Sequence, residues 1–237
     1  MQILQDNKIY YWLRKYDLRP MVLEYLQTKL SNVELGASSK YSSSIDASMY
    51  IFRRGMLKEI LSCIIGVNVS SIQILLTEFG KPFLNKKDFS ASVNFNCSSS
   101  EDYVLYAFTT SNDVGCDIIY NMYGNDLNIK EDEIFSSGDI QLIHRGVDRK
   151  YEISKLWTKK EALLKCVGTG FSQLKLDSID LGGGEIMLNS LDNIKANKYF
   201  MFTSDILKNY TFSIAANADS CKSLSVEELV YENEIMF

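Results

Sequence analysis

Apolar residues recur at two different intervals along this chain of 237 residues, and each interval is typical of one kind of element. Intervals of three and four predict helices with one apolar face at 17–30, 45–66, 129–135 and 150–167. The spacing is most regular at 150–167, and the helix at 45–66 carries Met49, Phe52, Met56, Ile60 and Ile64 on its apolar face. Gly66 lies at its end and is a suitable residue to end a helix.

Short runs rich in apolar and β-branched residues predict strands between clusters of turn-forming residues. The predicted strands are 8–16, 72–77, 91–95, 103–109, 114–120, 186–189, 198–203 and 210–215. Gly, Pro, Asn, Asp and Ser predict turns at 80–82, 96–102 and 111–113. The order of a helix followed by strands occurs twice, with a break near 111–113, which favours two closely packed halves of similar make-up.

Composition narrows the classes of protein that the chain can belong to. Apolar residues make up 46% and charged residues 23%, which is typical of folded proteins and allows one large domain or two smaller ones. The net charge of -5 argues against nucleic acid as a partner. Charges are scattered through the first twenty residues, and no apolar run reaches the length of a membrane span. We therefore expect a cytoplasmic protein without a membrane partner.

Cysteine and histidine usage argues against several kinds of site. The five cysteines are widely spaced and include no CxxC pair, so neither a disulfide framework nor a zinc site is expected. His144 is the single histidine, which argues against a histidine-dependent triad or a metal site with several histidines. Any metal in this protein is therefore expected to have oxygen ligands.

One aspartate interrupts an apolar strand. The segment at 114–120 has the sequence VGCDIIY, and Asp117 is its charged residue. A carboxylate among apolar neighbours costs free energy unless it meets a cation or hydrogen-bond donors. Asp117 is therefore a candidate metal or ligand residue, and an aspartate at a strand end that faces water is the alternative interpretation.

The last predicted helix carries the second candidate group, within the segment LWTKKEALLKCVGTG. Trp157, Glu161 and Lys165 are four residues apart, so a helix places them along one face. An ion pair between Glu161 and Lys165 is the simplest interpretation, and such pairs contribute only about 0.3 to 0.5 kcal/mol. Gly168 and Gly170 predict a sharp turn after the helix.

Together these two motifs resemble the signature of the surfactin-type 4′-phosphopantetheinyl transferases, a family of two-lobed enzymes. That signature is a V-G-hydrophobic-D strand, a later W-S/T-x-K-E-A/S-x-x-K helix and a G-x-G turn. The residues that match it are Val114, Gly115, Asp117, Trp157, Thr158, Lys160, Glu161, Ala162, Lys165, Gly168 and Gly170. Weaker matches are Gly80-Lys81-Pro82, 95–100, the late strand at 210–215 and the helix that contains Phe52, Arg53, Arg54 and Leu57.

The resemblance implies a fold and an activity. The fold would be α+β, with two similar lobes related by pseudo-twofold symmetry, each a small, mainly antiparallel sheet packed with a long helix. The N-terminal lobe would be 1–113 and the C-terminal lobe 114–237, with coenzyme A bound at the junction. The enzyme would be a monomer of the holo-acyl-carrier-protein synthase type in fatty-acid, polyketide or nonribosomal peptide synthesis. It would move phosphopantetheine to a serine of an apo acyl or peptidyl carrier protein and release adenosine 3′,5′-bisphosphate.

The resemblance also implies roles for particular residues. Asp117 and Glu161 would hold Mg²⁺ or Mn²⁺, hard cations that carboxylates suit, and Glu161 would take the proton of the serine. Lys160 and Lys165 would contact phosphate oxygens as point charges. Further contacts to coenzyme A are implied for Lys81, Pro82, Ser98, Ser99, Arg53 and Arg54. A solvated helix face is the alternative for the two arginines, and ordinary turn residues are the alternative for the others.

Two positions depart from the family pattern and keep other functions open. Ile119 stands where the family often has a second strand carboxylate, and Ser99 stands where it usually has a histidine that helps hold phosphate. These departures favour, as the alternative, a non-catalytic relative that binds coenzyme A or a carrier protein. A coenzyme A-dependent acyltransferase is a third hypothesis, and it would need His144 as its base.

Overall fold

The computed structural model describes residues 4–85, 92–121, 130–168, 175–181, 186–188, 197–205, 207–217 and 224–229. Its helices are α1 (Pro20–Gln27), α2 (Asn32–Ser38), α3 (Ser44–Ile65), α4 (Glu131–Ile134), α5 (Ser137–Arg145) and α6 (Arg149–Val167). Its strands are β1 (Lys8–Lys15), β2 (Ile74–Leu76), β3 (Pro82–Leu84), β4 (Asn94–Ser100), β5 (Tyr103–Thr109), β6 (Val114–Tyr120), β7 (Ile186–Leu188), β8 (Asn197–Ser204), β9 (Tyr210–Asn217) and β10 (Ser225–Glu228).

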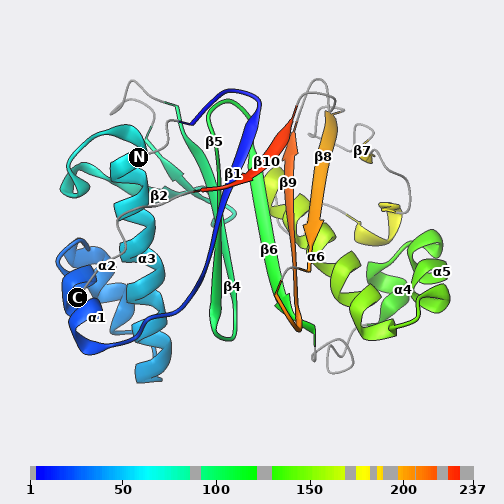
Figure 1. The fold of residues 1–237 in the computed structure, drawn as a ribbon, viewed down its shortest axis with the longest axis horizontal. Coiled ribbons are helices and arrows are strands. Elements are labelled where there is room, and N and C mark those ends of the chain that lie inside the picture. Colours follow the sequence, from blue (N-terminus) through cyan, green and yellow to red (C-terminus); the bar gives the residue numbers. More distant parts are fainter. Residues whose placement is uncertain are drawn as a thin grey trace.

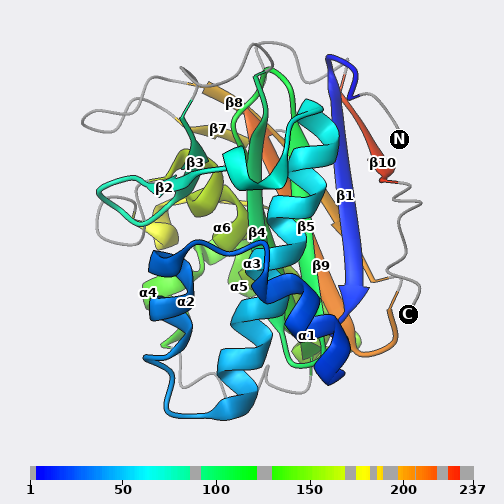
Figure 2. The same ribbon diagram turned by 90° about the vertical axis from the view of Figure 1, so that its left-hand side faces the viewer.

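Two four-stranded sheets lie at the centre, and helices cover their outer faces (Figure 1). The first sheet has the order β10-β1-β5-β4, and the second has the order β6-β9-β8-β7. Strand pairing is antiparallel except between β1 and β10. A view from the side shows α1, α2 and α3 in front of the first sheet, with the β2–β3 hairpin beside them (Figure 2). The predicted α+β class, with small, mainly antiparallel sheets packed with helices, is confirmed.

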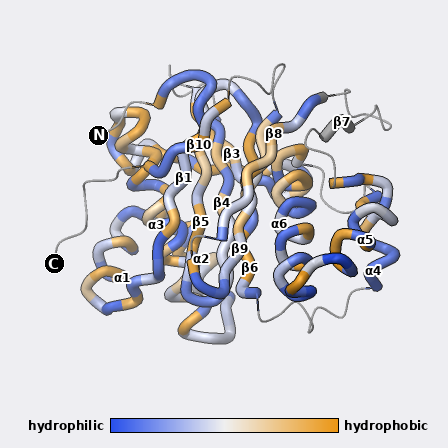
Figure 3. The backbone as a smooth tube through the Cα atoms, turned by 45° about the vertical axis from the view of Figure 1, so that its right-hand side comes forward, coloured by the Kyte–Doolittle hydropathy of each residue, from blue (hydrophilic) through white to orange (hydrophobic). Residues whose placement is uncertain are grey.

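Apolar side chains form three clusters that hold these layers together. One outer cluster lies between α1, α3 and the first sheet, and the other outer cluster lies between α5, α6 and the second sheet. The middle cluster joins the two sheets, with Leu105 from one side and Cys116, Ile118 and Phe212 from the other. Hydrophobic and hydrophilic stretches accordingly share each of the outer helices in Figure 3, because only one helix face is buried.

Polar side chains of β4 join the edge strands of the two sheets. The carboxamide oxygen of Asn96 accepts from the backbone N–H of Cys116 at 3.0 Å, and the Ser100 hydroxyl accepts from the Tyr120 N–H at 3.0 Å. Between them, Ser98 donates to Asp117 at 2.8 Å. The bonds made by Asn96 and Ser100 satisfy N–H groups on the edge of β6, since buried backbone donors need partners. The junction between the sheets is therefore fixed by side chains two residues apart on β4.

Several predicted elements are confirmed, and one prediction is wrong. Strands β5 and β6 have the predicted bounds, and α3 ends at Gly66, whose φ of 78° suits glycine. The turn predicted at 96–102 is wrong, because β4 runs through to Ser100. Helices α2 and α5 and strands β3 and β10 were not predicted. The predictions at Ala91, Ile129, Gly170 and Asn189 lie outside the described residues.

The predicted lobe boundary falls between β5 and β6, which belong to different sheets. Strand β10 nevertheless returns to the first sheet, where it pairs with β1 from Lys8 opposite Ser225 to Tyr11 opposite Glu228. The division at 113 and 114 stays a prediction. Among the described residues, no helix combines the length and apolar character that a membrane span requires.

Candidate active site

Helix α6 lies directly on strand β6, and a glycine permits this close contact. A side chain at Gly115 would overlap the carbonyl oxygen of Ala162 and the backbone nitrogen of Cys166. Gly115 and Asp117 are two residues apart, so they share the face of β6 that α6 covers. The glycine therefore lets the helix approach until its side chains reach Asp117.

Three side chains from three elements meet at this contact. The ammonium of Lys165 on α6 donates to Oδ1 of Asp117 on β6 at 2.6 Å and to the Ser98 hydroxyl on β4 at 3.2 Å. The same ammonium lies 4.0 Å from Oε2 of Glu161, one turn earlier on α6. One cation therefore lies between two carboxylates that are far apart in the sequence.

Glu161 has unusual acid-base properties in this position. Burial and, to a smaller extent, the charge of Asp117 raise its pKa, Lys165 lowers it, and the net value is about 7. Burial lowers the pKa of Lys165, but the Asp117 carboxylate outweighs this effect, so the pKa lies above its ordinary value. Near neutral pH, Glu161 can therefore accept a proton while Lys165 stays charged.

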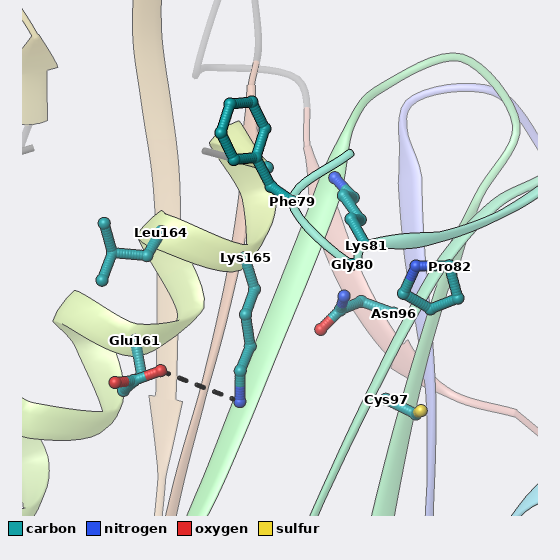
Figure 4. Close-up of a pocket in the computed structure, with 10 residues that line it drawn as sticks. Phe79, Gly80, Lys81, Pro82, Asn96, Cys97, Glu161, Leu164 and Lys165 are labelled. Atoms are coloured by element: carbon teal, nitrogen blue, oxygen red, sulfur yellow. Dashed lines mark ion pairs between the residues drawn. The ribbon is translucent and has the colours of Figure 1, made fainter. Parts of the chain in front are cut away.

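A pocket of about 310 Å³ opens beside these groups. Figure 4 shows Glu161 and Lys165 on one wall, with Gly80, Lys81 and Pro82 of the β2–β3 hairpin opposite. The remaining lining residues are Phe79, Asn96, Cys97, Leu164 and Gly168. The pocket thus lies between the hairpin, β4 and the C-terminal half of α6.

Lys81 links the hairpin to the end of α6. Its ammonium donates to the carbonyl oxygen of Cys166 at 2.8 Å, in the last turn of the helix. Carbonyl groups at a helix C-terminus carry partial negative charge, so a cation is favourable there. Lys81 and Lys165 therefore place two positive charges on the pocket.

Two family models match successive parts of the chain. A model described as "4′-phosphopantetheinyl transferase, N-terminal" matches residues 18–111, and one described as "4′-phosphopantetheinyl transferase superfamily" matches residues 113–215. The chain belongs to the 4′-phosphopantetheinyl transferase superfamily. The second match contains Asp117, Glu161 and Lys165, which meet at the pocket.

Individual members of the superfamily are similar over most of the chain. The chain is 25% identical to the 4′-phosphopantetheinyl transferase HetI of Nostoc sp. over 174 residues, which is 73% of each protein. It is 27% identical to a putative 4′-phosphopantetheinyl transferase of Synechocystis sp. over 163 residues, or 68% of this chain and 65% of that one. It is 25% identical to a phosphopantetheinyl transferase of Thraustochytrium sp. over 208 residues, or 80% and 71%.

Two solved structures match part of this chain. Holo-(acyl-carrier-protein) synthase of Neisseria meningitidis matches 45% of this chain and 97% of its own, with 18% identity and a TM-score of 0.38. The enzyme of the same name from Thermotoga maritima matches 46% of this chain and 64% of its own, with 16% identity and a TM-score of 0.33.

The two arginines of α3 have different surroundings in this member of the superfamily. Arg53 donates from Nη1 to the Ser99 hydroxyl at 2.9 Å, so its charge lies at the position where Ser99 replaces the family's histidine. Arg54 donates to Glu34 at 2.7 Å and to the carbonyl oxygen of Ile74 at 3.2 Å. Arg54 therefore joins α2, α3 and the hairpin, whereas Arg53 lies beside β4.

The structure does not bring Lys160 to the pocket. Its side chain is only 1% exposed, and its ammonium contacts Asp139 at 2.8 Å and the carbonyl oxygens of Leu176 and Ile179 at 2.6 and 2.7 Å. These acceptors lie on a different side of α6 from Asp117. We therefore leave Lys160 out of the coenzyme A site that the resemblance implied.

Two further residues explain the departures and alternatives seen in the sequence. Ile119 shares the face of β6 with Asp117 and is 8% exposed, so a buried apolar group stands where the family pattern described above often has a carboxylate. Among the described residues, no group of three or more potential metal-ligating side chains occurs. His144 is exposed on α5 and does not line the pocket described above.

Sequence reasoning missed the parts of the site that depend on close packing. Phe79, Cys97 and Leu164 line the pocket but carried no recognisable chemical signal. Asn96 and Ser100 did carry one, because with Ser98 they form polar positions two apart, the period of a strand face. That period was masked by the turn-forming character of Asn and Ser.

Proposed function

We propose that this chain is a 4′-phosphopantetheinyl transferase that uses coenzyme A as its substrate. It would transfer the phosphopantetheine arm to a serine of an apo acyl or peptidyl carrier protein and release adenosine 3′,5′-bisphosphate. The observation that carries this proposal is the meeting of Asp117, Glu161 and Lys165 beside a pocket at the contact of β6 and α6. Superfamily membership supports an activity of the holo-acyl-carrier-protein synthase type.

The donor set at this contact fits a hard divalent cation. Two carboxylates, from Asp117 and Glu161, lie within 4.0 Å of one positively charged nitrogen, and this arrangement supports a cation site between them. Mg²⁺ is commonly bound by one or two carboxylates together with substrate phosphates and water, and Mn²⁺ accepts similar ligands. Bound there, Mg²⁺ or Mn²⁺ would supply positive charge for the pyrophosphate of coenzyme A.

Glu161 is the general base of the proposed reaction. The serine oxygen forms a bond to the phosphorus next to pantetheine, while the bond from that phosphorus to the bridging pyrophosphate oxygen breaks. Glu161 takes the serine proton, and the departing oxygen stays on adenosine 3′,5′-bisphosphate. In the metal-free site the pKa of Glu161 is about 7, and a bound divalent cation would lower it, so the carboxylate would be ionised and able to take the proton at neutral pH.

Positive side chains around the pocket would bind the phosphates of the substrate. Lys165 lies next to both carboxylates, so its ammonium can reach an oxygen of the reacting phosphate. Lys81 and Arg53 extend the positive charge toward the hairpin and β4, with Pro82, Ser98 and Ser99 nearby. We assign the nucleotide end of coenzyme A to this side. A monomeric state and a cytoplasmic location stay predictions.

The test is direct transfer to an apo carrier protein, measured by intact mass with coenzyme A and Mg²⁺. Wild-type protein should add the mass of one phosphopantetheine. Asp117→Ala and Glu161→Ala should each lower the rate at least about a hundredfold, the usual scale for loss of a catalytic base or charge stabiliser. Circular dichroism should show a folded protein in both cases.

His144→Ala is the matched control, because this exposed side chain lies outside the pocket. It should transfer at the wild-type rate. Binding of coenzyme A without any mass gain on several carrier proteins would contradict transfer and favour the non-catalytic relative. With an acyl-coenzyme A as donor, a gain of the acyl mass that the His144 variant loses would favour acyl-transfer chemistry instead.

A further inference from the structure

Lys165 occupies the position at which a divalent cation would be held. Its ammonium is 2.6 Å from Asp117 Oδ1 and 4.0 Å from Glu161 Oε2, and the two carboxylate side chains are only 9% and 14% exposed. Two shielded carboxylates repel each other unless a positive charge lies between them. In this structure, Lys165 supplies that charge.

An ammonium and a divalent cation cannot share this position. Carboxylate oxygens bind Mg²⁺ at about 2.0 to 2.1 Å, closer than the Lys165 ammonium lies to the same Asp117 oxygen. Two positive charges at that separation repel each other strongly in a partly buried site. A metal ion bound to Oδ1 of Asp117 would therefore require Lys165 to leave that oxygen.

The side chain has room to leave. Lys165 is 31% exposed and lines the pocket, so its flexible stem can turn the ammonium toward bound phosphate. The Ser98 hydroxyl accepts from Lys165 and donates to Asp117, and the second of these bonds can keep the carboxylate oriented after Lys165 leaves. The same lysine can thus neutralise the carboxylates in one state and contact substrate in the other.

We infer that Lys165 is the built-in counter-ion of the Asp117 and Glu161 pair, and that it is displaced into the pocket when the divalent cation binds. This inference rests on the proposed function, because it takes these carboxylates as metal ligands. Lys165 then makes metal binding weaker than the two carboxylates alone would allow. It also couples loading of the metal to the delivery of a positive charge to the substrate.

The test is replacement of Lys165 by methionine, which keeps most of the unbranched stem and removes the charge. Isothermal titration at pH 8 with Mn²⁺ alone should give a dissociation constant at least about tenfold lower than that of wild type. With a chelator present, the thermal midpoint of Lys165→Met should fall, and Mn²⁺ should raise it more than it raises that of wild type. Transfer by the loaded variant should nevertheless be slower.

Two matched variants complete the experiment. Lys165→Arg keeps the charge and should bind Mn²⁺ as weakly as wild type. Lys155→Met removes a lysine from the same helix that pairs with Glu152 at 3.9 Å, and it should change neither reading. Unchanged or weaker Mn²⁺ binding by Lys165→Met, with wild-type stability in chelator, would overturn the inference. Failure of the wild type to bind Mn²⁺ or transfer the arm would overturn the proposed function itself.

Discussion

Helix α6 carries two lysine–aspartate pairs with nearly the same chemistry and different surroundings. Lys160 pairs with Asp139 at 2.8 Å, and their side chains are 1% and 0% exposed. Lys165 pairs with Asp117 at 2.6 Å, but there the lysine is 31% exposed and lines the pocket. Both lysines belong to the same sequence motif, five residues apart, and they differ in the packing around each side chain.

The two pairs differ in the hydrogen-bond acceptors that surround each ammonium. Lys160 has three acceptors close by, so all three of its protons have partners, and burial lowers its pKa. Lys165 shares its charge between two carboxylates, and the influence of Asp117 raises its pKa. A closed pair of this kind holds segments together, whereas an open pair can exchange partners with a ligand.

The largest expected effect is the loss of the closed pair. Lys160→Met leaves Asp139 buried without its cation, which typically costs about 3 to 5 kcal/mol of stability. Urea unfolding at pH 7.5 should show this loss for Lys160→Met and a smaller loss for Lys165→Met, whose site is partly open to water.

The effect on catalysis by the folded molecules should have the opposite order: the loss should be smaller for Lys160→Met than for Lys165→Met. Because Lys160 lies away from the pocket, molecules of Lys160→Met that stay folded should keep the wild-type Michaelis constant for coenzyme A. Asp139→Asn keeps the size of the side chain and serves as a second variant if Lys160→Met does not fold. An increased Michaelis constant for coenzyme A in either variant would mean that Lys160 does contribute to phosphate binding, which would contradict the distinction between the two lysines.

A second prediction concerns the pH dependence that Glu161 gives to the open pair. Its pKa is about 7 in the folded protein against an ordinary value of 4.5, so the folded state binds more protons between these values. Stability of the metal-free protein should therefore fall as pH rises from about 4.5 to 7 and then level off. Glu161→Gln should remove this contribution.

The measurement is the difference in urea midpoint between wild type and Glu161→Gln, in chelator, at pH 5.5 and pH 8. Other titrating groups cancel in that difference. The glutamine variant should gain relative to wild type at the higher pH, because wild type alone then carries the ionised, partly buried carboxylate. An equal difference at both pH values would show that Glu161 titrates near its ordinary range.

How much of this could be predicted from the sequence depends on the range of the interactions. The bounds of β5 and β6 and the end of α3 at Gly66 followed from local pattern, because alternation and a glycine stop are local signals. Strand β10 could not be predicted, since a short polar segment becomes a strand only where β1 offers an edge. The motif likewise gave Asp117 and Glu161 as candidates.

The different roles of the basic residues could not be predicted from the sequence. Lys160 and Lys165 both match the family motif, and nothing in the letters places Asp139 beside the first and Asp117 beside the second. Gly115 was a matching letter as well, and its reason appears only when α6 lies against it. Contacts between distant segments decide which matching residue serves structure and which serves chemistry.

The smallest predicted effect extends the comparison to the arginines of α3. Arg54 is held by Glu34 and a backbone carbonyl, so Arg54→Met should lower stability and leave the Michaelis constant for coenzyme A unchanged. Arg53 meets only a serine hydroxyl among its hydrogen bonds described above, and Arg53→Met should raise that constant about tenfold, the factor for 1.4 kcal/mol.

Ser99→His then decides whether positive charge is missing at this position. If Arg53 already supplies it, an imidazole at position 99, whose present hydroxyl lies 2.9 Å from Nη1 of Arg53, adds little, since two cations would compete for one phosphate. The Michaelis constant should then fall less than about twofold, well under the tenfold given by 1.4 kcal/mol. A larger fall, measured in the same transfer assay, would mean that Arg53 is committed to the fold as Arg54 and Lys160 are. Lys165 and Lys81 would then be the basic residues that stay assigned to substrate binding.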